Sequence, residues 1–87
     1  MTVKQFVNEV LEHIENNVCY LAIMPNDQGY DIEVEVNGDI IAGNYATGTQ
    51  DLQKAREIAD KIEQEFGRLN IQVFDHREDW EDYLAQV

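Results

Sequence analysis

The strict alternation of residues 30–36 constrains the fold of this chain more than any other feature. Apolar side chains occupy every second position, and the positions between them hold three acids, here called the acidic row: Asp31, Glu33 and Glu35. Because side chains alternate between the two faces of a strand, this pattern predicts a strand with one core face and one anionic face. Asn37-Gly38 tolerates the positive φ angles of a type I′ turn. We therefore expect residues 39–46 to return as the next strand of a tight hairpin.

The chain before this hairpin predicts a helix and a first strand. Thr2 and Gln5 match a capping box, and apolar residues at helical spacing predict an amphipathic helix over residues 3–16. The apolar run 18–24 is typical of a strand buried on both faces. Residues 25–29 have the composition of a turn.

The chain after the hairpin predicts a second helix and a fourth strand. Thr49 can cap a helix whose apolar stripe runs from Leu52 to Phe66. Gly67 is expected to end this helix in the left-handed conformation. Alternation then predicts a strand with three apolar positions, Leu69, Ile71 and Val73.

A last short helix is predicted at the end of the chain. Asp75 and Glu78 match a second capping box. The apolar residues that follow recur at i, i+3, i+4 and i+7: Trp80, Tyr83, Leu84 and Val87.

The elements together predict an α+β fold with the order αβββαβα. The expected architecture is a three-strand antiparallel meander with a fourth strand added at an edge, and with the helices packed mainly on one face. The chain has 87 residues. Two domains would leave each half too short to bury its own core, so we expect residues 1–87 to form a single compact acidic domain.

The order αβββα in the first part of the chain resembles the topology of the double-stranded-RNA-binding domain. That family grips phosphate with the Lys-rich start of its last helix, whereas the corresponding helix here begins Gln50-Asp51-Leu52-Gln53-Lys54. The resemblance therefore concerns topology and carries no function across.

The balance of charge excludes several classes of partner. The chain has 18 acidic and 6 basic residues, a formal net charge of -12. Direct binding of nucleic acid needs Lys and Arg to replace the phosphate counterions, and anionic lipid repels such a chain as well. We expect neither nucleic acid nor a membrane as a partner. Cys19, the single cysteine, lies in an apolar run and predicts a small buried hydrophobe, which fits a reducing, cytoplasmic compartment.

The positions of the charges are more informative than their total. No Lys or Arg lies between Gln5 and Gln53, whereas the second predicted helix mixes both signs. The carboxylates of the acidic row leave one face of the strand about 6.6 to 6.8 Å apart, and like charges that are neighbours on a sheet are destabilising. This spacing is comparable to that of phosphates along a nucleic-acid strand. The row is either a phosphate mimic or a solvated sheet face, and Asp39 is a candidate to extend it.

A second acidic patch lies near the end of the chain. It surrounds Trp80 and consists of five acids: Asp75, Glu78, Asp79, Glu81 and Asp82. Acids in the first turn of a helix complement its dipole, which accounts for the first three of them and not for the last two. Trp80 is expected either to anchor the helix to the core or to act as an exposed interface hot spot.

The sequence predicts no catalytic, cofactor-binding or metal-binding constellation. The chain contains no Ser, and neither His13 nor His76 has a second nitrogen or sulfur ligand at a recognised spacing. Residues 43–49 have the glycines and hydroxyl of a phosphate-binding loop without its Lys, and residues 26–31 lack the EF-hand spacing. Paired carboxylates without a cleft carry no specificity, so we do not expect an enzyme.

Three functions remain open from the sequence. The first is a nucleic-acid-mimicking inhibitor that blocks a basic surface on a nucleic-acid-handling protein, like the anti-restriction or anti-CRISPR proteins of bacteriophages and mobile elements. The second is an immunity protein or antitoxin that neutralises a cationic nuclease. The third is a structural, self-associating accessory domain. The partner-binding candidates are the acidic row, Asp39, Trp80 and the acids beside Trp80, and we expect a monomer or a homodimer.

Overall fold

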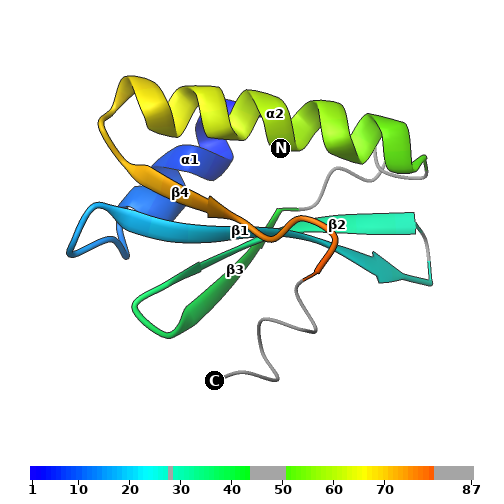
Figure 1. Ribbon diagram of the computed structural model, residues 1–87, viewed down its shortest axis with the longest axis horizontal. Helices are drawn as coiled ribbons and strands as arrows, with labels where there is room; N and C mark the ends of the chain where they lie inside the picture. Colours follow the sequence, from blue (N-terminus) through cyan, green and yellow to red (C-terminus); the bar gives the residue numbers. More distant parts are fainter. Residues whose placement is uncertain (28, 44–50, 80–87) are drawn as a thin grey trace.

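The helices and strands follow one another in the predicted order, and both helices lie on one side of a single sheet (Figure 1). The computed structural model describes residues 1–27, 29–43 and 51–79. These residues form α1 (Val3–Leu11), β1 (Val18–Asn26), β2 (Gly29–Val36), β3 (Asp39–Gly43), α2 (Leu52–Arg68) and β4 (Gln72–Asp75). The expected α+β class is confirmed. The predicted last helix, with Trp80, lies outside the described residues.

The four described strands have the order β3-β2-β1-β4 in the sheet. β1 pairs antiparallel with β2, and β2 pairs antiparallel with β3, so the predicted meander is confirmed. β4 adds to the other edge of β1 in parallel orientation, with Val73 opposite Cys19. A parallel partner needs a crossover connection, and α2 lies in that connection. The crossover places α2 and β4 together beside β1.

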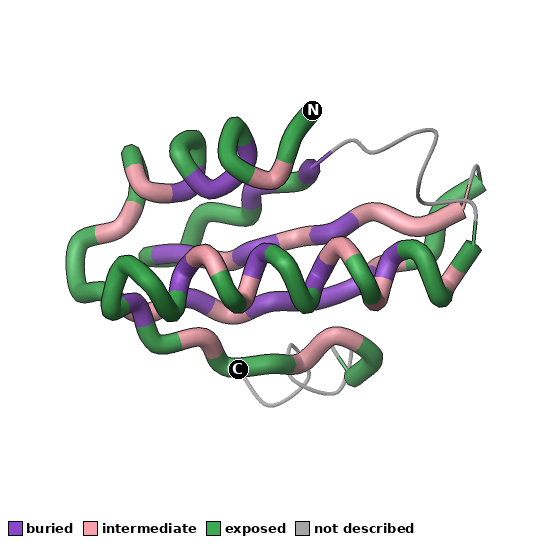
Figure 2. Tube along the Cα trace, turned by 90° about the horizontal axis from the view of Figure 1, so that it is seen from above, coloured by how far each residue is buried: buried purple, intermediate pink, exposed green. Residues whose placement is uncertain are grey.

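The core lies between the sheet and the two helices. Its largest fully buried side chains come from every layer and include Phe6 of α1, Leu21 of β1, Ile32 of β2 and Phe66 of α2. Figure 2 shows buried positions recurring along α2, as expected for an amphipathic helix. Burying one such side chain stabilises the fold by ~1.5–3 kcal/mol. Neither described helix is long and apolar enough to cross a membrane.

The hairpin turn between β2 and β3 is confirmed in its backbone angles. Asn37 has a φ of 52° and Gly38 a φ of 87°, and a type I′ turn requires positive φ at both central residues. Val36 and Asp39 are paired on either side of this turn. The two-residue connection therefore fixes the register of the whole hairpin.

Helix α1 is shorter than predicted, because it ends at Leu11 rather than at residue 16. The amides of His13 and Ile14 donate to carbonyls three residues back, which tightens the end of the helix. Asn17 then has a φ of 59°. Asn tolerates this left-handed conformation, which turns the chain into β1.

The first predicted turn is also shorter in the structure, because β1 continues through Pro25 and Asn26. Asn26 pairs with Gly29, which begins β2. The amide of Ile23 donates toward the β4 side of the strand, to the carbonyl of Arg77. The nitrogen of Pro25 points to the same side, beyond the end of β4, so its missing N–H removes no bond of the β1–β2 ladder.

Both predicted ends of α2 are corrected. Asp51, rather than Thr49, is the N-cap, and its side chain accepts a hydrogen bond from the amide of Gln53. Gly67 is helical, and the left-handed residue is Asn70, with a φ of 60°. The fourth strand consequently starts at Gln72 rather than at residue 69. The helix persists through Gly67 because Asn70 supplies the left-handed turn three residues later.

Candidate acidic protein-binding face

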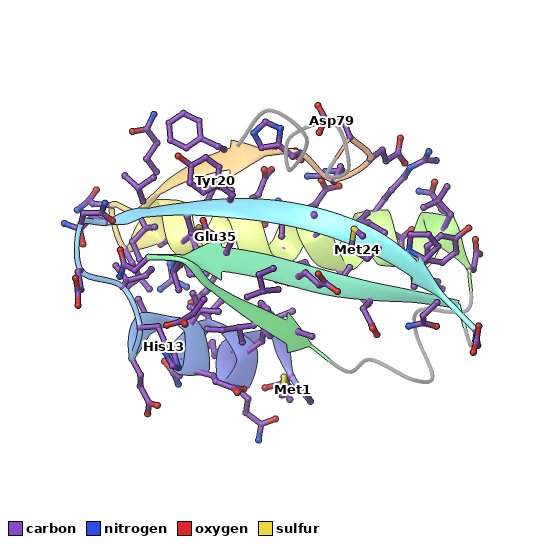
Figure 3. All side chains as sticks on the ribbon, turned by 90° about the horizontal axis from the view of Figure 1, so that it is seen from below. Met1, His13, Tyr20, Met24, Glu35 and Asp79 are labelled. Carbon is purple, nitrogen blue, oxygen red and sulfur yellow. The ribbon has the colours of Figure 1, made fainter. Side chains whose placement is uncertain are left out.

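The acidic row lies on the side of the sheet opposite the helices, here called the open face (Figure 3). The alternate residues of β2 are buried in the core, so the acids of the same strand point away from it. The register sets apolar residues on both sides of the row: Tyr20, Ala22 and Met24 on β1, and Ile40 and Ala42 on β3. The row is therefore the middle one of three strips on the open face, with an apolar strip on each side.

The acidic row carries charge that the described part of the chain does not neutralise. None of its three carboxylates forms an ion pair with a described residue. Glu35 accepts a hydrogen bond from the backbone N–H of Gly38 at 2.8 Å. Burial, and then the neighbouring charge of Asp31, raises the pKa of Glu33 above its usual value. A partner that brings positive charge would relieve this repulsion.

The side chains of the apolar strips differ in exposure, and the strip on β1 is accessible at Tyr20 and Met24 but not at Ala22. Ile40 is 51% exposed, whereas Ala22 is fully buried. Tyr20 is half-buried and stacks on Phe74 of β4 with 5.1 Å between the ring centroids. An exposed aliphatic side chain and an aromatic stack therefore border the row on either side of Glu35.

Asp39 does not extend the acidic row, contrary to the sequence-based expectation. It is directly opposite Val36 in the register, and opposed residues share a face of the sheet. Val36 is buried in the core, so Asp39 lies at the helix side. Its carboxylate is 3.7 Å from Nδ1 of His13. The expectation is wrong because the two-residue turn pairs Asp39 with a core residue of β2 rather than with an acid.

The described acids of the C-terminal patch have partners. Glu78 Oε1 lies 2.6 Å from Nη2 of Arg56, an arginine of α2. Asp79 Oδ1 lies 3.2 Å from Nδ1 of His76. These contacts give the two described acids partners within the fold. Trp80, Glu81 and Asp82 lie outside the described residues.

Arg77 forms ion pairs with three carboxylates, an arrangement that the sequence did not predict. Its guanidinium lies 2.9 Å from Asp75 of β4, and 2.8 and 3.1 Å from Asp60 and Glu63 of α2. Asp75 also accepts the backbone N–H of Arg77, in place of the capping box predicted with Glu78. These groups meet because α2 and β4 lie side by side after the crossover. No local sequence pattern signals such a contact.

Two of the acids around Arg77, Asp75 and Glu63, have pKa values shifted in opposite directions. Burial acts to raise the pKa of Asp75, but the hydrogen bonds from Arg77 outweigh it and hold that pKa below its usual value. Burial, followed by the interaction with Asp75, raises the pKa of Glu63. Since the arginine is only 19% exposed and its partners come from two elements, we interpret this arginine cluster as a structural clasp between α2 and β4.

The described residues also show the surroundings of Cys19 and of the candidate metal ligands, whereas residues 44–49 of the candidate phosphate-binding loop lie outside them. Cys19 is fully buried, which confirms the predicted small hydrophobe. Burial, with smaller contributions from Glu63 and Glu35, raises the pKa of its thiol to about 12. Across residues 1–27, 29–43 and 51–79, no group of three or more His, Cys, Asp or Glu side chains could hold a metal ion.

No family model, curated protein or solved structure matches the chain. The open face combines half-buried carboxylates with apolar neighbours on both sides. Chemically, such a surface can bind a positively charged surface of another macromolecule.

Proposed function

We propose that this protein is a small acidic inhibitor that uses its acidic row to occupy a basic surface of a nucleic-acid-handling protein. A contrast among the acids carries the proposal. Glu78 faces Arg56 of α2, which the fold brings to it, and Asp75 faces Arg77, two residues along the chain, whereas the acidic row faces no cation of the described chain. Like charges that neighbour each other on a sheet reduce stability. A cationic partner would turn this repulsion into attraction.

The geometry of β2 supports a phosphate mimic. Strand positions two residues apart are separated by about 6.6 to 6.8 Å, which gives a regular line of negative charge. β2 is paired on both sides, by β1 and by β3. The line of charge is therefore held by an internal strand, and such preorganisation reduces the entropy lost on binding. The net charge of -12 would also steer the protein toward a basic target and accelerate the encounter.

The proposal is tested by capture followed by competition. The immobilised protein is incubated at low salt with lysate of the native host, and retained proteins are eluted with rising salt and identified. The purified partner is then bound to a labelled nucleic acid, and displacement by this protein is followed by fluorescence anisotropy. The variant Glu33→Lys/Glu35→Lys reverses two charges of the row, and Glu9→Lys/Glu12→Lys reverses two exposed charges of the first helix and its cap as a matched control.

The expected partner is a nucleic-acid-binding protein that releases its nucleic acid when this protein is added. Loss of two charged contacts should weaken binding at least about tenfold in the row variant, since about 1.4 kcal/mol corresponds to a factor of ten. The control should stay within about threefold of the wild type. Equal affinity of the two variants would overturn the proposal. A host nucleic-acid machine as partner fits the counter-defence class, whereas a cationic nuclease toxin fits an immunity protein.

A further inference from the structure

A partner of the open face has to match its apolar strips as well as its acidic row. Ile40 is 51% exposed beside Glu35, and Met24 is half-buried beside Asp31. A flat polycationic surface would leave these apolar side chains against water or against hydrated ammonium groups. Apolar surface next to a charged site indicates a partner with apolar groups of its own. The complementary surface is therefore a line of cations with apolar residues on both sides.

The dimensions of the three strips fit an α-helix lying along β2. β1 and β3 are separated by two strand spacings, about 9–10 Å, and a helix with its side chains is about 10–12 Å across. Helix positions i, i+4 and i+7 form one stripe about 10 Å long. The acidic row spans about 13 Å, and the long side chains of Arg and Lys can cover the difference. An extended strand fits less well, because its alternate residues point away from the open face.

We propose that the open face binds a cationic amphipathic helix that lies along β2. A central stripe of Arg or Lys meets the acidic row, and the residues bordering this stripe pack on Ile40 at one side and on Met24 and Tyr20 at the other. This inference rests on the proposed function, since it names the chemistry of the partner for the same surface. It adds an apolar component, so affinity depends on shape and side-chain order as well as on charge.

The inference is tested on the full chain with two synthetic peptides of about 15 residues, a length at which Ala-rich helices begin to form in water. The matched peptide has Arg at i, i+4 and i+7 and Leu at i+1, i+3, i+8 and i+10, in an alanine background. The control peptide has the same composition, with Arg and Leu reordered so that the cations are spread around the helix. Circular dichroism checks that both have equal helicity, and isothermal titration calorimetry measures their affinities.

Two pairs of protein variants complete the test. Asp31→Asn/Glu33→Gln/Glu35→Gln neutralises the row, and Glu9→Gln/Glu12→Gln/Glu15→Gln removes as many charges from the helix side of the chain. Removing like-charge repulsion from the sheet does not threaten folding. Ile40→Ser removes the exposed apolar border, and Leu69→Ser changes a similarly exposed residue, 47% accessible, at the end of α2.

The matched peptide is expected to bind at least about tenfold more tightly than the control peptide, and to lose about fivefold in Ile40→Ser and little in Leu69→Ser. If both peptides bind equally, and if this binding is lost in the row variant and kept in the Glu9→Gln/Glu12→Gln/Glu15→Gln variant, the helix inference is overturned. The proposed function, binding of a basic surface, then still stands. Binding of the matched peptide that is unaffected by neutralising the row would overturn both.

Discussion

Arg77 Nη1 donates to Asp60 Oδ1 at 2.8 Å and so joins the segment after β4 to the middle of α2. The backbone of the same residue continues the sheet, because the amide of Ile23 donates to the Arg77 carbonyl at 2.7 Å. One arginine therefore fastens the segment after β4 to the helix through its side chain and to β1 through its main chain.

Replacing Arg77 by Met should destabilise the fold. The substitution removes the cation and leaves the half-buried carboxylates of Glu63 and Asp75 close together and near the exposed Asp60, so the free energy of unfolding should fall by about 2 kcal/mol, less than for a fully buried pair. Urea denaturation at neutral pH measures the change. The control Lys54→Met removes the exposed contact to Glu57 at 3.9 Å and should cost less than about 0.5 kcal/mol. Equal losses in the two variants would show that the arginine cluster is not a clasp.

Replacing Glu33 by Gln should stabilise the protein at neutral pH and have less effect in acid. At pH 7 the variant no longer carries the charge that repels Asp31, so we expect a gain of about 0.5 kcal/mol. The pKa of Glu33 is raised in the folded state above its ordinary value of 4.5, which applies to the unfolded state. Between the unfolded-state and the folded-state pKa, the folded state therefore binds more protons than the unfolded state. The contribution of Glu33 to the stability of the wild type then rises as pH falls through this window, and the advantage of the variant shrinks.

Urea denaturation of both proteins at a series of pH values between about 7 and 4.5, the ordinary pKa of the group, measures this difference. Glu9→Gln, on the exposed side of α1, serves as the control that removes one charge outside the row. An advantage of Glu33→Gln that grows toward acid pH would contradict the raised pKa.

Cys19 should be unreactive in the folded protein. Its side chain is fully buried and the pKa of its thiol is about 12, so almost no thiolate is present or accessible near pH 8. A disulfide reagent such as dithionitrobenzoate should modify it at a rate limited by opening of the fold, and rapidly in urea. Modification of the native protein as fast as of the unfolded chain would refute the buried position.

Removing the cap of α2 should destabilise the protein, because Asp51 accepts the amide of Gln53 at 2.9 Å. Asp51→Ala should lower the free energy of unfolding by about 1 kcal/mol. Asp51→Asn should keep most of the stability, since Asn caps helices comparably well. Thermal or urea denaturation compares the three proteins. If the alanine variant is as stable as the asparagine variant, the helix does not depend on this cap.

The order of the elements could be predicted because it depends on local patterns. The alternation in residues 30–36 and the Asn37-Gly38 turn determine a hairpin whichever partners surround it. Element ends were predicted less well. Asp51 rather than Thr49 is the cap, and Asn70 rather than Gly67 is the left-handed residue. Several residues near each end of a helix can cap it or adopt the left-handed conformation, and packing selects one of them.

The sequence by itself determined that three acids share one face of a strand whose other face is apolar, since side-chain periodicity is a property of the backbone. Only the tertiary structure decided which acids meet a cation. The crossover brings Arg56 of α2 to Glu78 and Asp60 of α2 to Arg77, and the turn directs Asp39 toward His13. Charges far apart in the chain can pair only where the fold brings their elements side by side, and on the open face it brings apolar residues to the acidic row instead.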